Sequence, residues 1–489
     1  MTASRIGISC TVHPLLSKAR KGLEQVGVPS RGMRFRSASR ARTLIERIVA
    51  LPEAEADDLL ANVFRDFSAR HADFESLLWQ HFELVAHHIQ TTHQLSPGRC
   101  LLIGACFTRE YTMASQGQHL SMVAAPSQEG LRAGQQRFVM SVHAARPRYR
   151  SSLEFRSGTL DETGLVLFDA SKQELLAGQC RGASHYHRSE FGALLDELGA
   201  GSALALRVLA QIPEQFTLAE LEGALLALDV RSDVEPARAA TITAIRALTA
   251  SHYVTTFPIE SELSNRVIHS AKGCRAEDGH FVPFTDRNGT SRYYATYSAR
   301  AGVHCPPLQI ETKDFATFNH STLRGSITHK ANLTLFPRRI RGRYVMLCRD
   351  RRNALLVSTS ESLRTWKDVT RPVLPLQSLT QAQLRCASAP LETNAGWLLL
   401  THRTWHTGRH TIGAVLLDLD DPSKVIGQLP ELALGPRSTI HDDSEFNASN
   451  CGALIHGKHL FIPYACSTAG IEIARVSLVD LLSEMDTVT

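Results

Sequence analysis

Short segments in which apolar and polar positions alternate dominate the C-terminal part of the chain. Each begins with an aromatic-rich or aliphatic run, continues through a turn into a second apolar run, and ends in polar residues. The leading runs are Tyr293–Tyr297, Tyr344–Leu347, Trp397–Thr401 and Leu460–Pro463. A period of two is typical of β-strands, and strand units repeating every ~40–50 residues are typical of β-propellers. The pattern therefore predicts a propeller, whose polar loop residues surround one central axis.

Apolar residues at helical spacing predict two further regions. The first is an N-terminal helical segment at 43–95, where Pro52 separates two helices and acidic residues follow it. The second is a helical insertion at 188–252, where Thr217 and Glu220 have the spacing of a capping box. Between them, 96–187 is predicted to hold the first propeller strands, and 253–489 the remaining blades. The strands expected in the earlier block are Leu101–Gly104, Arg137–His143, Ser152–Arg156 and Gly164–Phe168.

Composition narrows the classes of protein. The formal charge of +5 over 489 residues gives no reason to expect nucleic-acid binding, and no apolar run has the length of a membrane span. The ten cysteines form no CxxC pair, so we expect reduced thiols and a cytoplasmic protein. Residues 1–42 are basic and are expected to form a partly disordered tail, or one that packs on a partner subunit or an anionic ligand. No zinc pattern is present, and the histidines near the N-terminal helices share no face with carboxylates, so no metal is expected.

Four charged motifs lie at predicted strand ends in the propeller region. The adjacent carboxylates Glu277 and Asp278 precede one strand, and an extended stretch would direct Lys330 and Asn332 the same way. An arginine-rich run at Arg349–Asn353 and a histidine, His402, each follow another strand. Guanidinium groups bind oxyanions with two parallel hydrogen bonds. One acid together with Lys, Arg and His fits phosphorolysis of a glycoside, since phosphate needs no second carboxylate to activate it.

The motifs also resemble a known family. Residues 277–284, 330–347, 390–401 and above all 412–430, with the run Asp418–Gly427 followed by Cys451-Gly452-Ala453-Leu454, are similar to glycoside hydrolase family 130. The resemblance extends more weakly to about residue 40. It implies a five-bladed β-propeller, mainly β, with an N-terminal helical segment and a helical insertion. It also implies a β-mannoside phosphorylase or a β-1,2-mannosidase, and a possible homo-oligomer.

The resemblance implies a role for individual residues. Asp278 falls on the family's general acid, which relays its proton through the mannose 3-hydroxyl. Lys330, Arg349 and His402 fall on the basic residues that hold phosphate, and Glu277, Asn332, Asp350 and Arg351 are expected on the substrate side. The implied partners are a β-mannoside oligosaccharide and inorganic phosphate as co-substrate, without another cofactor. The implied product is α-mannose 1-phosphate, formed with inversion.

The chain also departs from the family pattern. Gly279-His280 follows Asp278 where the family has a small residue and arginine, and His119-Leu120-Ser121 replaces Asn-Pro-Ser. Glu445-Phe446-Asn447 stands where Pro-Asn-Val is expected. Two alternatives therefore stay open: a β-mannoside hydrolase in which an acidic residue near Asp443 or Glu445 activates water, and a catalytically inactive sugar-binding propeller.

Overall fold

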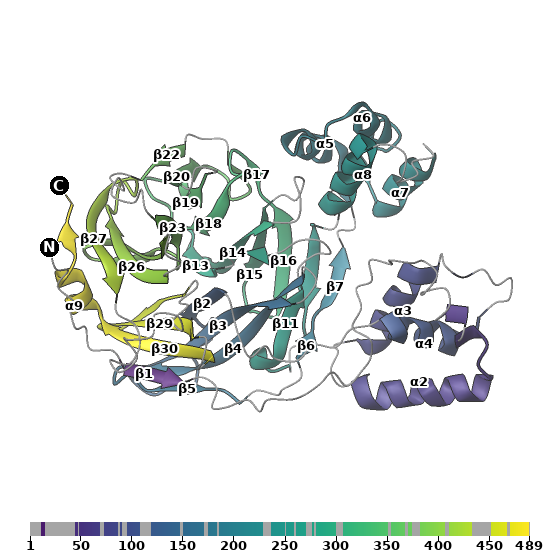
Figure 1. The fold of residues 1–489 in the computed structure, drawn as a ribbon, viewed down its shortest axis with the longest axis horizontal. Helices are drawn as coiled ribbons and strands as arrows, with labels where there is room; N and C mark the ends of the chain where they lie inside the picture. The colour runs from purple at the N-terminus through teal and green to yellow at the C-terminus, as the bar shows by residue number, and fades with distance from the viewer. Residues whose placement is uncertain are drawn as a thin grey trace.

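The fold was analysed in a computed structural model of the chain. It describes residues 11–14, 45–46, 48–68, 73–86, 89, 95–107, 119–146, 150–170, 175–182, 185–227, 236–249, 251–258, 261–269, 276–277, 280–299, 307–350, 354–366, 370–373, 382–405, 410–432, 451–466 and 470–488. Within these residues, five sheets of four or more strands are arranged around a common centre, as Figure 1 shows. The predicted five-bladed propeller is thus confirmed.

Blades 1 and 2 contain the strands nearest the two helical regions. Their central strands follow one another as antiparallel neighbours, with β2 innermost in blade 1 and β12 and β13 innermost in blade 2. Blade 1 comprises β2 (His119–Ala124), β3 (Gln135–Arg146), β4 (Arg150–Asp161), β5 (Val166–Phe168), β6 (Leu176–Ala177) and β11 (Arg266–His269). Blade 2 comprises β7 (Gln179–Gly182), β10 (Tyr253–Thr256), β12 (Ala276–Glu277), β13 (Val282–Thr285), β14 (Ser291–Ala299), β15 (Leu308–Thr312) and β16 (Thr317–Thr322).

Blades 3 to 5 contain the remaining repeats. Blade 3 comprises β18 (Ala331–Leu335), β19 (Tyr344–Arg349), β20 (Leu355–Ser360) and β22 (Thr370–Pro372). Blade 4 comprises β23 (Ala382–Cys386), β24 (Leu391–Thr393), β25 (Gly396–Trp405), β26 (His410–Leu417), β27 (Val425–Leu432) and β31 (Asp486–Thr487). Blade 5 comprises β28 (Leu454–His456), β29 (His459–Cys466), β30 (Gly470–Ser477) and β1 (Thr11–Pro14). Two small pairs, β17 (Arg324–Gly325) with β21 (Thr365–Trp366) and β8 (Tyr186–His187) with β9 (Gln215–Phe216), lie outside the blades.

The core lies between the blades. Five hydrophobic clusters each join two neighbouring sheets, and together they run around the whole ring. In the cluster between blades 1 and 2, for example, Phe155 stacks on Phe318 with ring centroids 5.3 Å apart. Both faces of each sheet are therefore buried, because successive side chains of a strand point alternately toward the two neighbouring blades.

The last blade is completed from the N-terminal end of the chain. β1 pairs antiparallel with β30, with Thr11 opposite Arg475 (Figure 1). These four residues of the predicted tail are a strand of the sheet, which corrects the expectation for this part of 1–42. The four-residue sequence Thr-Val-His-Pro is too short for its periodicity to distinguish a strand from a loop. The other residues of 1–42 lie outside the described ranges.

Both predicted helical regions are present beside blade 2. Between β7 and β10 the chain forms the insertion, with α5 (Arg188–Glu197), α6 (Ala203–Leu209), α7 (Leu218–Ala227) and α8 (Pro236–Thr249) around a core of its own. The capping box is confirmed: the Thr217 N–H donates to Glu220 Oε2 at 2.7 Å, and the Glu220 N–H donates to Thr217 Oγ1 at 3.3 Å. A short closing helix, α9 (Leu478–Ser483), follows β30.

Directly after the predicted N-terminal helical segment, the 96–187 region begins with a helix that the sequence did not predict. α2 (Glu53–Phe67) begins directly after Pro52, and α3 (Phe74–Val85) follows, both as expected. α4 (Pro97–Phe107), however, covers Leu101–Gly104, which had been predicted as a strand. Its apolar run is continuous because α4 packs against α2 on one side and α3 on the other. A helix buried on several sides loses the 3.6-residue alternation that would identify it.

Candidate active site

The three predicted phosphate-binding residues lie at the same end of two neighbouring blades. In blade 3, Ala331 at the start of β18 pairs with Arg349 at the end of β19, so Lys330 and Arg349 come to one end of the sheet. In blade 4, Arg385 near the end of β23 pairs with His402 in β25. We call this end of blades 3 and 4, with Lys330, Arg349, Arg385 and His402, the basic end. The turns that join β18 to β19 and β24 to β25 lie at the opposite end, which we call the turn end.

The basic end is a buried environment. Arg349 and His402 are each 5% exposed, and Lys330 is half-buried. Burial raises the pKa of the Cys348 thiol to about 12; the positive charge of Lys330 opposes that rise, and the carboxylate of Asp350 adds to it. Because a guanidinium is always charged and costly to bury, a buried arginine beside a lysine favours a site for an oxyanion.

Asn332 links the basic residues of the two blades. Its Oδ1 accepts a hydrogen bond from the Cys386 N–H at 2.6 Å, and its Nδ2 donates to the Cys386 carbonyl at 3.3 Å. Asn332 is fully buried and has a φ of 53°, a left-handed conformation that asparagine tolerates better than most residues. The register between β18 and β19 shifts between Ala331 and Thr334, so Asn332 lies in a β-bulge. Its predicted contact with the substrate stays a prediction.

The acidic motif lies in blade 2. Glu277 belongs to β12 and pairs with Ser298 of β14, while Asp278 lies outside the described residues. After it, the Phe281 N–H donates to Ser121 Oγ in blade 1 at 2.9 Å. The inner strands of blades 1 and 2 are therefore joined by a side chain, as Asn332 joins those of blades 3 and 4. Ser121 belongs to the motif in which the chain departs from the family pattern.

Of the remaining predicted substrate residues, Asp350 has a local role in the structure. Its Oδ1 accepts from the Ala354 N–H at 2.9 Å, and the Asp350 N–H donates to the Ala354 carbonyl at 3.1 Å. The carboxylate thereby fixes the two ends of the connection from β19 to β20. Arg351 lies outside the described residues, as do Asp443 and Glu445 of the hydrolase alternative.

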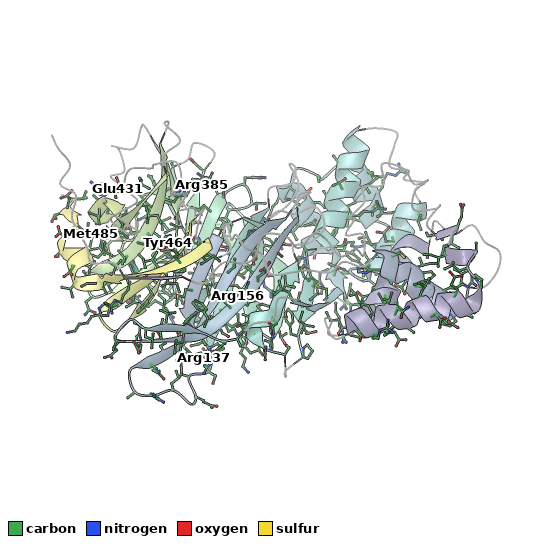
Figure 2. The ribbon with its side chains drawn as sticks, turned by 60° about the horizontal axis from the view of Figure 1, so that its bottom comes forward. Arg137, Arg156, Arg385, Glu431, Tyr464 and Met485 are labelled. Carbon is green, nitrogen blue, oxygen red and sulfur yellow. The ribbon has the colours of Figure 1, made fainter. Side chains whose placement is uncertain are left out.

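Two polar features were missed from the sequence. Arg385 pairs with His402 across blade 4, although no motif drew attention to it. In blade 1, Arg156 Nη2 and Glu154 Oε2 lie 3.3 Å apart with Glu154 fully buried, and burial lowers the pKa of Arg156. Figure 2 shows Arg156 and Arg385 on strands of these separate blades. The spacing of Glu154 and Arg156 could have revealed this pair, because charged residues two positions apart in a predicted strand lie on one face.

The described parts of the chain contain no candidate metal site and no candidate membrane-spanning helix. Among those residues, no group of three or more His, Cys, Asp or Glu side chains is arranged to hold a metal ion. No helix in the same ranges is long and apolar enough to span a membrane. The six cysteines described as free thiols are Cys100, Cys106, Cys180, Cys348, Cys386 and Cys451.

Fold and site together define a five-bladed propeller with a buried basic cluster at one end of neighbouring blades. Residues 284–486 match the sequence profile of glycoside hydrolase family 130, described as beta-1,4-mannooligosaccharide phosphorylase. The match agrees with the resemblance over residues 284–486 of the 489-residue chain.

Curated relatives are similar to parts of the chain, and one solved structure was compared with it. A 1,2-beta-oligomannan phosphorylase of Thermoanaerobacter sp. is 31% identical over 30% of this chain and 51% of its own length. A beta-1,2-mannobiose phosphorylase of Listeria innocua is 24% identical over 40% and 57%, respectively, and a beta-1,4-mannooligosaccharide phosphorylase of Ruminococcus albus is 25% identical over 35% and 55%. The alignments thus span about half the length of these relatives. The Listeria enzyme bound to beta-1,2-mannobiose superposes with a TM-score of 0.38 and 16% identity, over 75% of this chain and 99% of that one.

Proposed function

We propose that the protein cleaves β-mannosidic bonds by inverting phosphorolysis. A phosphate oxygen attacks the anomeric carbon, the bond from that carbon to the bridging oxygen breaks, and Asp278 supplies the proton that the leaving sugar takes up, through the mannose 3-hydroxyl. The products are α-mannose 1-phosphate and a shortened sugar. Asp278 supplies the one proton that is needed, and phosphate is already an anion. No second carboxylate is therefore required to activate the nucleophile.

The observation that carries the proposal is the placement of Lys330, Arg349 and His402 at one end of blades 3 and 4. A hydrolase has no use for an anion clamp, whereas a phosphorylase must hold a phosphate carrying negative charge against the sugar. Buried cations stabilise that charge strongly because little water competes. The named relatives support the same reaction class. Glu277, Asp350 and Arg351 are proposed on the sugar side.

The test is product formation with and without phosphate. Purified protein is incubated with β-1,2- and β-1,4-mannobiose and the corresponding longer oligosaccharides, and mannose 1-phosphate and free mannose are quantified. We expect mannose 1-phosphate only when phosphate is present. Free mannose formed equally without phosphate would identify a hydrolase instead. Sugar binding without either product would identify an inactive binding propeller.

Variants assign the residues. Asp278→Asn is expected to abolish turnover, and unchanged activity would remove Asp278 from the mechanism. Arg349→Ala is expected to lower kcat/KM for phosphate by about 100-fold or more, since a buried charge contact to the oxyanion is lost. Arg343→Ala removes the same charge just before the other end of the same strand, where Arg343 pairs with Glu361 at 3.2 Å, and is expected to change kcat/KM less than about twofold.

A further inference from the structure

The bulged segment Ala331–Leu333 is fixed from both neighbouring blades. On one side Thr296 Oγ1, in β14 of blade 2, donates a hydrogen bond to the Leu333 carbonyl. On the other side the Asn332 amide makes its two hydrogen bonds to the backbone of Cys386 in blade 4. The side-chain amide of Asn332 thus pairs with both the N–H and the C=O of Cys386, as the backbone of a neighbouring β-strand would. The segment therefore connects three consecutive blades, through the second strand of blade 2 and the inner strands of blades 3 and 4.

The two ends of this connection lie next to the basic residues. Asn332 follows Ala331, the pairing partner of Arg349, and Cys386 follows Arg385, the pairing partner of His402. Each end of the Asn332–Cys386 contact is thus one residue away from the pairing partner of a basic residue. Beta-bulges are frequent beside active sites, where they redirect side chains.

We propose that Asn332 is a positioning residue: it sets the spacing between Lys330 and Arg349 on blade 3 and His402 on blade 4, and so the affinity for phosphate. This inference rests on the proposed function, because phosphate is the anion that these residues are expected to hold. Asn332 acts through the backbone of Cys386 and needs no contact with the sugar. Small errors in spacing matter, since a misplacement of ~1 Å at a reacting group lowers rates by about 100-fold.

The molecule offers a matched control for a purely structural role. The same two blades are also joined at the turn end, where Arg338 binds Glu392 with an Nη2–Oε1 distance of 2.7 Å and Nε 3.0 Å from each carboxylate oxygen. Arg338 also lies over the ring of Trp397, 4.9 Å from its centroid. A change here loosens the same blade pair at the end opposite the cations.

The experiment compares Asn332→Gly with Glu392→Ala in the full chain. Glycine accepts the left-handed backbone of position 332 without strain and adds no charge, so the amide bridge is removed without a steric clash. Phosphate binding is measured by calorimetry with inorganic phosphate, and KM is measured separately for phosphate and for the mannoside. We expect Asn332→Gly to raise Kd and KM for phosphate about 10-fold or more and KM for the mannoside less than about threefold. Glu392→Ala is expected to leave all three within about twofold.

Several outcomes overturn the inference. An unchanged phosphate Kd in Asn332→Gly, or equal changes in both KM values, would show that the amide bridge only supports the fold. If Asn332→Gly fails to fold, Thr296→Val is used: it removes the other bond to the same segment with almost no change in shape and is expected to raise the phosphate Kd about threefold or more. An unchanged Kd there overturns the inference. A wild-type protein that binds no phosphate overturns the proposed function as well, which separates the two failures.

Discussion

The turn end and the basic end of blades 3 and 4 differ in how deeply their polar side chains are buried. At the turn end the polar contacts are partly exposed: Arg338 with Glu392, and Arg339 with Asp286 of blade 2 at 3.0 Å. At the basic end Asn332, Arg349 and His402 are buried. Exposed ion pairs contribute little free energy because water screens them, whereas buried polar groups change energies strongly in either direction. The comparison teaches that the turn end maintains shape through apolar packing, while the basic end is organised for charge.

The largest effect should come from the apolar packing at the turn end. Trp397 is fully buried between blades 3 and 4, edge-to-face with Phe336 at 5.2 Å, and its Nε1 donates to the Leu419 carbonyl at 3.1 Å. Trp397→Ala is expected to lower the free energy of unfolding by about 3–5 kcal/mol, measured by urea denaturation. Leu206→Ala, at a position 65% exposed on α6, serves as control and should change it by less than about 0.5 kcal/mol. A loss below about 1 kcal/mol for Trp397→Ala would contradict the assignment of shape to this packing.

An intermediate effect should depend on pH and comes from a buried histidine in blade 2. His320 stacks on Tyr253 with ring centroids 3.9 Å apart, and its Nε2 lies 3.1 Å from Thr255 Oγ1. Burial lowers the pKa of His320 from its ordinary value to about 3, so the folded protein keeps it neutral. Burial also raises the pKa values of Tyr253 and Cys180, which stay neutral in the same range.

The sign follows from proton counting. Below about pH 6.5 the unfolded chain binds a proton at this histidine that the folded chain does not, so the free energy of unfolding falls as the pH falls from about 6.5 toward 3. The slope is at most about 1.4 kcal/mol per pH unit. Urea titrations of the wild type and His320→Gln between pH 7 and 4.5 should show a steeper loss in the wild type. Parallel curves would refute a neutral buried histidine.

The smallest effect should come from the exposed ion pair at the turn end. A double-mutant cycle with Arg338→Met and Glu392→Gln is expected to give a coupling free energy of about 0.2–1 kcal/mol, and one that shrinks at high salt. Denaturation at 0.05 M and 1 M salt measures it. A coupling above 2 kcal/mol would mean that the turn end, too, relies on charge, and the contrast between the two ends would fail.

Structural features that depend on residues close together in the chain could be predicted from the sequence. The aromatic runs such as Trp397–Thr401 became β25, and Thr217 with Glu220 formed the capping box, because periodicity and caps depend on neighbours in the chain. Leu101–Gly104 was assigned to a strand because a short apolar run has no period when a helix is buried on several sides. The left-handed Asn332 and its contact with Cys386 depend on residues 54 positions apart, which no local pattern records. Lys330, Arg349 and His402 were identified as charged residues at predicted strand ends, but their individual roles came from the resemblance and remain predictions.

The pairing of β1 with β30 has a consequence for how the chain folds. Thr11 meets Arg475, so the ring closes through one of the longest sequence separations available to this chain. Contacts of such high order form slowly, because the entropy of a large loop must be lost first. Until β1 arrives, β30 presents a free hydrogen-bonding edge, which can template pairing with another chain. As long as β1 is unpaired, self-association at this edge of blade 5 can therefore compete with closure of the ring.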